Sequence, residues 1–225
     1  MTTMRKTVSP RRRAPGRPAR TSGDQRDRLL DAAIALFSGQ GVAATPLSAI
    51  ARKARVTPAL VHYYFGNRDQ LLDALMTERI VPLVARMAAT LAETGGEPAT
   101  LVRTFVATFL RLLADNPWLP PLWVREVLSE GGALREHLTT RIAPQIAPML
   151  AARFAEAQRQ GLLNPALDPR LVVVSMIGLT IFPMAAQSIW RRLLDADDVD
   201  TDTLIRHTLA LLGSGLAAPA TRKDS

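Results

Sequence analysis

Hydrophobic residues recur along this chain at the three- to four-residue spacing of helices, and no stretch of useful length alternates as a half-buried strand would. The first helix is expected from about Asp24, and the glycines Gly39 and Gly41 are expected to end it. Its apolar stripe consists of Leu30, Ala33, Ile34 and Phe37. The pattern therefore predicts an all-α protein.

A threonine–proline pair opens each of the next two helices, at Thr45-Pro46 and at Thr57-Pro58. Threonine can cap a helix, and a proline in the first helical position loses no hydrogen bond. The two expected helices run over Pro46–Ala54 and Pro58–Phe65, with a short break at Arg55 and Val56.

A fourth helix is expected from about Arg68, and Pro82 should kink or bend it. Further helices are expected over Leu101–Ala114, Leu119–Gly131, Leu134–Gln160, Pro169–Leu194 and Thr201–Leu212. The spacing of these elements predicts a small front domain over residues 23–75 and a larger helical domain over residues 76–215.

The chain has 225 residues and a formal net charge of +8, which is unevenly distributed. Seven basic residues and no acidic residue occur between Met1 and Thr21. Such a segment favours a polyanionic partner, nucleic acid ahead of a membrane, although a solvated tail that only aids solubility is the alternative. Prolines among the arginines predict a disordered basic arm over residues 1–22, and residues 216–225 are expected to form a second disordered tail.

Several classes of protein are disfavoured. The chain has no cysteine, which excludes a disulfide framework, a thiol nucleophile and a Cys-ligated metal site. The three histidines, His62, His137 and His207, have neither metal nor triad spacing, so an enzyme, a metal and a cofactor are not expected.

A membrane protein is also disfavoured. The most apolar stretch, Leu171–Ile189, is interrupted by polar residues and a proline, so we interpret it as a core or interface helix. The basic N-terminal segment has no apolar run behind it, so it is not a signal peptide. We expect a cytoplasmic, nucleoid-associated protein without a membrane partner.

The second and third helices have the arrangement of a helix-turn-helix. The first of the pair is mostly aliphatic, as packing on the second requires. The second must expose short and hydrogen-bonding side chains in its N-terminal half, where such a helix enters the major groove. That half contains Thr57, Pro58, Ala59, Leu60 and His62.

The segment from Thr45 to Leu72 resembles the DNA-binding signature of TetR-family transcriptional regulators, and the resemblance covers about Gln25 to Leu75. Its most specific part is the aromatic run Tyr63-Tyr64-Phe65 followed by Asn67, Arg68 and Leu71-Leu72. The resemblance implies an N-terminal three-helix DNA-binding domain and a C-terminal helical domain for ligand binding and dimerisation. It also implies a homodimer that binds double-stranded, palindromic operator DNA, represses transcription, and releases the DNA when a small-molecule effector binds.

By position, the resemblance assigns phosphate contact or positioning to Thr45, Tyr63, Tyr64 and Arg68. It assigns base contact to Thr57, Ala59, Leu60 and His62, with Pro58 in the same half of the helix. Phe65 is expected to be core.

Two positions depart from the family pattern. Arg55 stands where glycine is usual, which predicts a positive φ and places a cation beside the DNA backbone. His62 stands where an aromatic residue is usual, so a phosphate contact there would be weaker or sensitive to pH.

Arg17 lies in a Gly-Arg-Pro triplet that resembles an AT-hook core, which lays an arginine into a narrow minor groove. Pro15 stands where the AT-hook usually has an arginine before the glycine. We expect the basic arm to add salt-dependent affinity for DNA.

The rear domain carries aromatic and methionine residues that suit an apolar ligand cavity, although ordinary core packing is the alternative for each. The expected lining residues are Phe105, Phe109, Trp118, Trp123, Met149 and Met176. Arg125, Glu126, His137 and Gln187 could orient a ligand. Trp123 and Arg125 near Glu126 raise the hypothesis of a flat or cationic compound.

The last two long helices are expected to form the dimer interface, because they carry more apolar surface than one solvated face allows. The expected interface residues are Val173, Ile177, Ile181, Met184, Ile205 and Leu209. The sequence thus favours a ligand-responsive repressor, and the alternative is an architectural DNA-binding protein without an effector.

Overall fold

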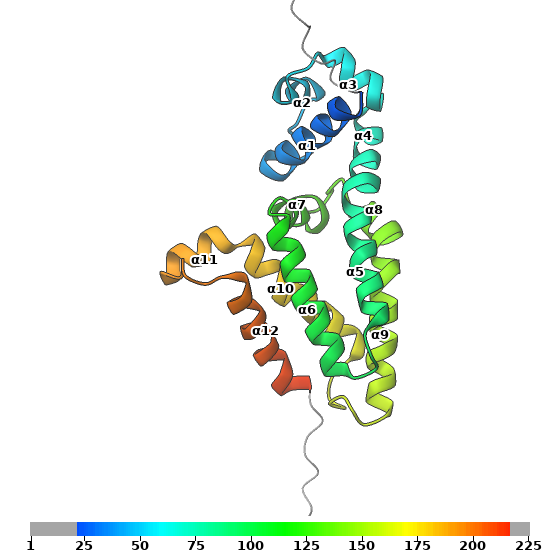
Figure 1. Ribbon diagram of the computed structural model, residues 1–225, viewed down its shortest axis with the longest axis vertical. Coiled ribbons are helices and arrows are strands. Elements are labelled where there is room, and N and C mark those ends of the chain that lie inside the picture. Colours follow the sequence, from blue (N-terminus) through cyan, green and yellow to red (C-terminus); the bar gives the residue numbers. More distant parts are fainter. Residues whose placement is uncertain (1–21, 217–225) are drawn as a thin grey trace, which may run out of the picture.

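The computed structural model describes residues 22–216, which form helices joined by turns and contain no strand (Figure 1). The expected all-α class is therefore confirmed. The α-helices are α1 (Ser22–Gln40), α2 (Leu47–Ala54), α3 (Pro58–Phe65), α4 (Arg68–Leu75), α5 (Val81–Glu93), α6 (Pro98–Asp115), α7 (Leu119–Trp123), α8 (Arg135–His137), α9 (Ala143–Arg159), α10 (Pro169–Ala185), α11 (Gln187–Leu194) and α12 (Thr201–Leu216). Three π-helical turns are η1 (Met76–Ile80), η2 (Val124–Leu128) and η3 (Leu138–Ile142).

The molecule is elongated, with α1, α2 and α3 gathered at one end (Figure 1). From there α4, η1 and α5 run along the long axis beside α9, and α6 and α10 cross the larger body. α7 lies between the two parts and contacts both α1 and α10. α11 projects sideways from the body, and α12 returns alongside α6.

The tails lie mostly outside the described residues. Arg17 and the basic arm fall there, apart from Ser22, which already begins α1. Residues 217–225 fall there as well, whereas Leu216 is buried at the end of α12 and so does not belong to a tail.

The start of α2 differs from the prediction. Thr45 does not cap α2, which begins at Leu47 with Pro46 as the residue before it. The Thr45 side chain is fully buried, and its hydroxyl donates to the carbonyl oxygen of Gly41 at 2.6 Å. Thr45 therefore braces the α1–α2 loop from within.

The single helix predicted over residues 169–194 is wrong. The chain bends by 72° between α10 and α11, after Ala185. Pro183 lies in the last turn of α10, where it has no N–H to continue the helical ladder. The indole Nε1 of Trp190 donates to the carbonyl oxygen of Pro183 at 2.7 Å, which fixes the bend.

The three π-helical turns were not predicted, and two of them have the same local cause. Pro82 follows the end of η1 by two residues, and Pro144 follows the end of η3 by two residues. A proline inside a helix lacks an N–H, and its ring collides with the carbonyl four residues earlier. Widening the preceding turn to a π turn relieves that collision, so the helix continues past the proline.

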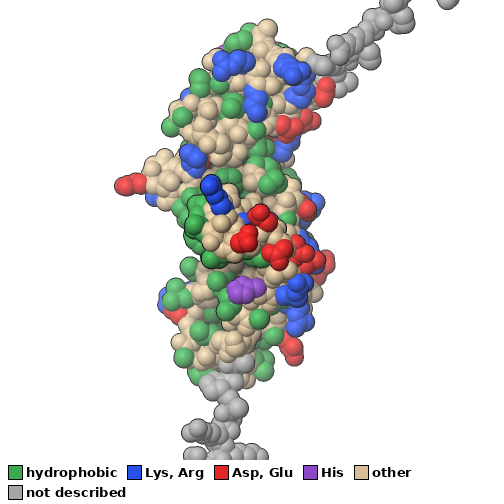
Figure 2. Space-filling view, turned by 90° about the vertical axis from the view of Figure 1, so that its left-hand side faces the viewer, with side chains coloured by type: hydrophobic (Ala, Val, Ile, Leu, Met, Phe, Trp, Pro, Cys, Tyr) green, Lys and Arg blue, Asp and Glu red, His purple; other side chains and the backbone are tan. Residues whose placement is uncertain are grey.

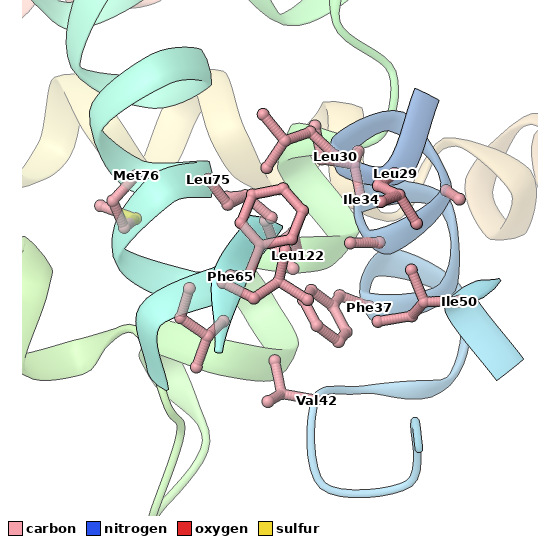
Figure 3. Packing of buried hydrophobic residues seen from close by; sticks show 14 of the residues in the cluster. Leu29, Leu30, Ile34, Phe37, Val42, Ile50, Phe65, Leu75, Met76 and Leu122 are labelled. Carbon is pink, nitrogen blue, oxygen red and sulfur yellow. The ribbon is translucent and has the colours of Figure 1, made fainter. Parts of the chain in front are cut away.

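Two hydrophobic cores share the molecule. One lies beneath α1 to α4 and includes Phe37, Phe65 and Leu75, yet it also contains Leu122 of α7. Figure 3 shows Leu122 among these residues. The other lies between α5, α6, α9, α10 and α12. The front helices are thus joined to α7 by a continuous core.

Arg55 generates a prediction about stability. It adopts a left-handed conformation, with φ 56° and ψ 48°, at the end of α2, which confirms the positive φ expected from the sequence. That conformation costs a non-glycine residue roughly 1–2 kcal/mol. Glycine avoids this cost, but its greater conformational freedom in the unfolded chain destabilises the folded state by roughly 0.5–1 kcal/mol. Arg55→Gly should therefore raise the free energy of unfolding by about 0.5–1 kcal/mol in urea denaturation. Arg55→Ala is the control, because it removes the charge and keeps the strain; an equal gain in both variants would contradict the explanation.

Candidate functional site

α3 presents an exposed face at the far end of the molecule. Its inner side is formed by Val61 and Phe65, which are buried against α1 and α4. The side chains that remain exposed are Thr57, Pro58, Ala59, His62 and Tyr63, and Leu60 is half-buried. The predicted reading residues therefore share one accessible surface.

Basic side chains lie next to this face, at the end of α2 rather than on α3 itself. Arg52, Lys53 and Arg55 are all exposed at the end of α2, immediately before α3. In the space-filling view Lys and Arg side chains lie on the upper end, which carries the front helices (Figure 2). This arrangement suits a phosphate backbone on either side of an inserted helix.

The two tyrosines on α3, Tyr63 and Tyr64, have different roles. Tyr63 is 80% exposed, and its ring meets that of Tyr64 edge-on, with centroids 5.2 Å apart. The hydroxyl of Tyr64 donates to Oε1 of Gln25 at 3.4 Å, which ties α3 to α1. Tyr63 thus offers its hydroxyl to a ligand, while Tyr64 positions the helix.

His62 has a defined tautomer. Its Nδ1 lies 2.8 Å from the carbonyl oxygen of Gly66, which can only accept a hydrogen bond. Nδ1 therefore carries a hydrogen, and in the neutral ring Nε2 is left as an acceptor pointing away from the backbone.

Two of the expected phosphate contacts are placed differently. Thr45 is buried, so its hydroxyl is not available to DNA. Arg68 is half-buried, and its Nη2 donates to the carbonyl oxygen of Thr45 at 3.1 Å. Both residues hold the α1–α2 loop against the start of α4.

A cavity of about 200 Å³ lies in the larger body, enclosed by η1, α5, α6, α7, α9 and α10. Among residues 22–216, all those that line it are hydrophobic. Every π turn contributes to the wall, through Met76 and Ile80 of η1, Val127 of η2, and Leu138 and Ile142 of η3. π turns are often found at functional sites, and here they form part of the wall of a wholly apolar cavity.

The predicted ligand residues are only partly brought together. Phe105, Phe109 and Trp123 line the cavity, and the rings of Phe105 and Phe109 pack at 5.4 Å. The predicted residues that do not line it are Trp118, Arg125, Glu126, His137, Met149, Met176 and Gln187. Trp118 packs on the front core and Met149 and Met176 on the rear one. The remaining four are polar and lie outside this wall, so of the residues behind the hypothesis of a flat or cationic compound only Trp123 faces the cavity.

Two of the polar candidates have structural roles instead. His137 lies 3.7 Å from a carboxylate oxygen of Asp73, and Arg141 makes an ion pair with the same oxygen at 2.9 Å. Glu126 is buried, and its carboxylate accepts hydrogen bonds from two backbone amides. The sequence missed most of the true lining, because the aliphatic residues of α5 and α9 look like ordinary core.

The predicted dimer residues face inward. Val173, Ile181, Met184 and Ile205 are buried within the chain, and Ile177 and Leu209 pack on the rear core. Val173, Ile177 and Ile181 line the cavity. The side of α10 that faces outward carries Leu171, Val174 and Phe182, at helical spacing and all strongly exposed. Within one copy of the chain, the side of α10 that was predicted as the interface is therefore buried, and the opposite side is exposed.

This outward apolar surface continues onto the neighbouring helices. Ile189, Leu193 and Leu194 of α11 are exposed, as is Leu211 of α12. Figure 2 looks at the side from which α11 projects and shows hydrophobic side chains across its middle, with acidic side chains beside them. We call the exposed residues Leu171, Val174, Phe182, Ile189, Leu193, Leu194 and Leu211 the lateral face.

Within residues 22–216, no single helix is long and apolar enough to cross a membrane; α10 and α11 together pass by length and composition only as a bent pair. In the same part of the chain, no three His, Asp or Glu side chains are grouped as a metal ion would require.

Comparison with known proteins identifies two family matches. The model for bacterial regulatory proteins of the tetR family matches residues 29–75, and the model for the tetracyclin repressor-like C-terminal domain matches residues 98–212. The second match alone covers about half of the chain.

The similar proteins are transcriptional regulators. The HTH-type transcriptional regulator BetI of Rhizobium meliloti (strain 1021) is 50% identical over 50 residues, which are 22% of this chain and 25% of that protein. The BetI of Burkholderia thailandensis is 28% identical over 138 residues, which are 59% of this chain and 69% of that protein. The structure of FadR from Bacillus subtilis, in complex with stearoyl-CoA, superposes with a TM-score of 0.65 at 22% identity, covering 84% of this chain and 98% of that chain. That likeness shows a shared fold.

The exposure of Tyr63 predicts a phosphate contact that does not involve charge on the protein. Tyr63→Phe should weaken binding to a selected operator duplex roughly 10- to 100-fold, because a hydrogen bond to a charged group contributes about 1.5–3 kcal/mol. The salt dependence of the binding constant should stay unchanged, since no cation is lost. Fluorescence anisotropy titrations at several salt concentrations measure both. Wild-type affinity in Tyr63→Phe would remove Tyr63 from the interface.

Proposed function

This chain belongs to the TetR family of bacterial regulatory proteins, and on that premise we propose that it is a ligand-responsive repressor. It binds a palindromic operator as a homodimer and releases the DNA when an aliphatic molecule fills the cavity. The observation that carries the proposal is a wholly apolar cavity whose wall includes α7, the helix that shares the core of the DNA-reading end.

The chemistry of the cavity supports an aliphatic effector. A wall without polar side chains gives a ligand no hydrogen bond, so binding free energy comes from burial of apolar surface. Burial contributes about 0.8 kcal/mol for each methylene group. The FadR structure with stearoyl-CoA supports the same class, because a regulator of this fold there holds a molecule with a long alkyl chain.

The DNA contacts are proposed from the exposed face of α3. Thr57, Ala59 and His62 meet base edges, with Pro58 and Leu60 beside them, while Tyr63 and Arg55 meet phosphates. The basic arm, with Arg17, adds affinity that does not depend on sequence. The division between a DNA-binding domain over residues 23–75 and an effector domain over residues 76–215 is proposed with them.

The homodimer is proposed through the lateral face. The exposed stripe on α10 is apolar and regular, as a self-complementary two-fold interface requires. The surface extends over three helices, and exposure of so many large hydrophobic side chains is unfavourable for a solvated monomer. Gly178 lies on the same side and is exposed, so two copies of α10 can approach closely.

The DNA-binding half of the proposal is tested by selecting duplexes from a random library with the full-length protein. The expected result is an inverted repeat, bound with a salt dependence that reflects several phosphate contacts. Binding that is weak and indifferent to sequence would instead favour an architectural protein.

The effector half predicts a regular dependence on chain length. Isothermal titration calorimetry with n-alkanols from hexanol to dodecanol should show affinity rising about fourfold for each added methylene until the cavity is full. The heat capacity change should be negative. Ile146→Asn places an unpaired amide on the cavity wall and should weaken binding at least about fivefold, since burying such a group costs roughly 1–3 kcal/mol. Ile146→Val is the control, and affinities that do not change with chain length would exclude this site.

The proposed dimer can be tested by a substitution that should halve the mass of the particle in solution. Phe182 is 69% exposed, so Phe182→Glu should leave the fold intact, bury a charge only in the dimer, and yield monomers at micromolar concentration by analytical ultracentrifugation. Leu162→Glu, at an exposed leucine outside the lateral face, should remain dimeric. A Phe182→Glu variant that sediments like the wild type would place the interface elsewhere.

A further inference from the structure

Glu126 is buried at the junction between the two ends of the molecule. Its residue is 5% exposed, and it lies in η2 outside the cavity wall. Oε1 accepts a hydrogen bond from the backbone N–H of Val42 at 2.8 Å, and Oε2 accepts one from the N–H of Ala133 at 3.1 Å. One carboxylate thus joins the α1–α2 loop to the segment after η2, across 84 residues of sequence in the first case.

The same turn of chain forms part of the cavity. Trp123 and Val127 flank Glu126 on α7 and η2, and both line the cavity. Glu126 therefore cannot stay in place if a ligand displaces its neighbours.

The loop that receives Glu126 fits closely against it. Gly41 has a φ of +90°, and a Cβ atom built on it would lie 3.1 Å from Cδ of Arg125 and 3.2 Å from Oε1 of Glu126. Any side chain larger than glycine would press on η2. A small movement of η2 is therefore passed directly to the loop.

Further hydrogen bonds connect this loop to the helices on both sides of α3, the helix proposed to contact DNA bases. The Thr45 hydroxyl donates to the carbonyl oxygen of Gly41, and Nη2 of Arg68 donates to the carbonyl oxygen of Thr45. The loop leads into α2, and Arg68 begins α4, so α3 is held between two helices whose starts are tied to the loop.

We propose that Glu126 is the positioning residue that couples filling of the apolar cavity to the placement of α3, and this rests on the proposed function. A ligand that displaces Trp123 and Val127 shifts the Glu126 carboxylate. This shift either breaks the hydrogen bond to the Val42 amide or moves that amide with it. In both cases the start of α2 moves. DNA affinity falls because the two α3 helices of a dimer no longer match their half-sites.

A carboxylate suits this role because both of its oxygens accept. Glutamine has nearly the same shape but only one acceptor, so its amide nitrogen must face one of the two backbone N–H groups. Glu126→Gln therefore weakens the link while changing the volume little. Glu126→Asp is a second variant that keeps the charge but is one methylene too short to reach both amides.

The test is a double-mutant cycle that needs no knowledge of the natural effector. Ala147→Phe fills the cavity from α9, and Ala143→Leu is a second filling variant should the first fail to fold. Operator affinity is measured for the wild type, for each single variant and for the double variant. Filling should weaken binding at least about tenfold in the wild-type background and less than about twofold in the Glu126→Gln background. Glu136→Gln, at an exposed site with the same change of charge, should leave the tenfold effect intact.

Hydrogen exchange of the Val42 amide gives a readout without DNA. Ala147→Phe should speed its exchange at least about fivefold, and Glu126→Gln alone should do the same. Additive effects on operator affinity, or unchanged exchange at Val42 in the filled variant, would overturn the role of Glu126. A wild type that binds no selected duplex would overturn the proposed function instead, and the exchange measurement would still decide the coupling.

Discussion

The hydrophobic core of the DNA-reading end is completed by residues of the larger body, and the rest of the structure depends on that shared packing. Leu122, Val127 and Leu134, which come from the segment between α6 and η3, are buried in the same cluster as Phe37 and Leu75. Leu122, Val127 and Leu134 also line the cavity. Close-packed side chains move together, because interiors leave few voids to absorb a displacement. The reading helix and the cavity wall are therefore mechanically one unit.

Local signals in the sequence were sufficient to predict the main helix of the DNA-reading end, α3. The Thr57-Pro58 pair and the helical spacing of Val61 and Phe65 depend on neighbours within one turn, and α3 has the predicted bounds. Thr57 occupies the N-cap position, but its side chain makes no capping hydrogen bond. The positive φ of Arg55 was predicted instead from the glycine that the TetR family usually has at this position. Thr45 was misplaced because a threonine before a proline suggests a cap, whereas tertiary packing turned its hydroxyl inward to Gly41.

For the larger body, the sequence predicted the helices but not the way in which their side chains are arranged. α10 is apolar on most sides, so periodicity could not tell its core side from its outward side, and Val173 and Ile181, which were expected at an interface, are buried within the chain. Two of the π turns, η1 and η3, were missed because a proline two residues later looks like a simple kink. Glu126 was expected to orient a ligand, since a carboxylate beside a tryptophan suits a pocket. Its actual partner, the Val42 amide, is 84 residues away, and no short-range pattern reveals such a contact.

The central claim is that filling the apolar cavity and releasing DNA are one event. It is tested most directly by titrating the complex of the full-length protein and its selected operator with decanol, following DNA release by anisotropy and cavity occupancy by calorimetry under the same conditions. The account predicts that the DNA is released over the same concentration range in which the cavity fills, and that Ile146→Asn shifts both curves by the same factor. Occupancy of the cavity with the operator still bound, or release that Ile146→Asn does not shift, would contradict it.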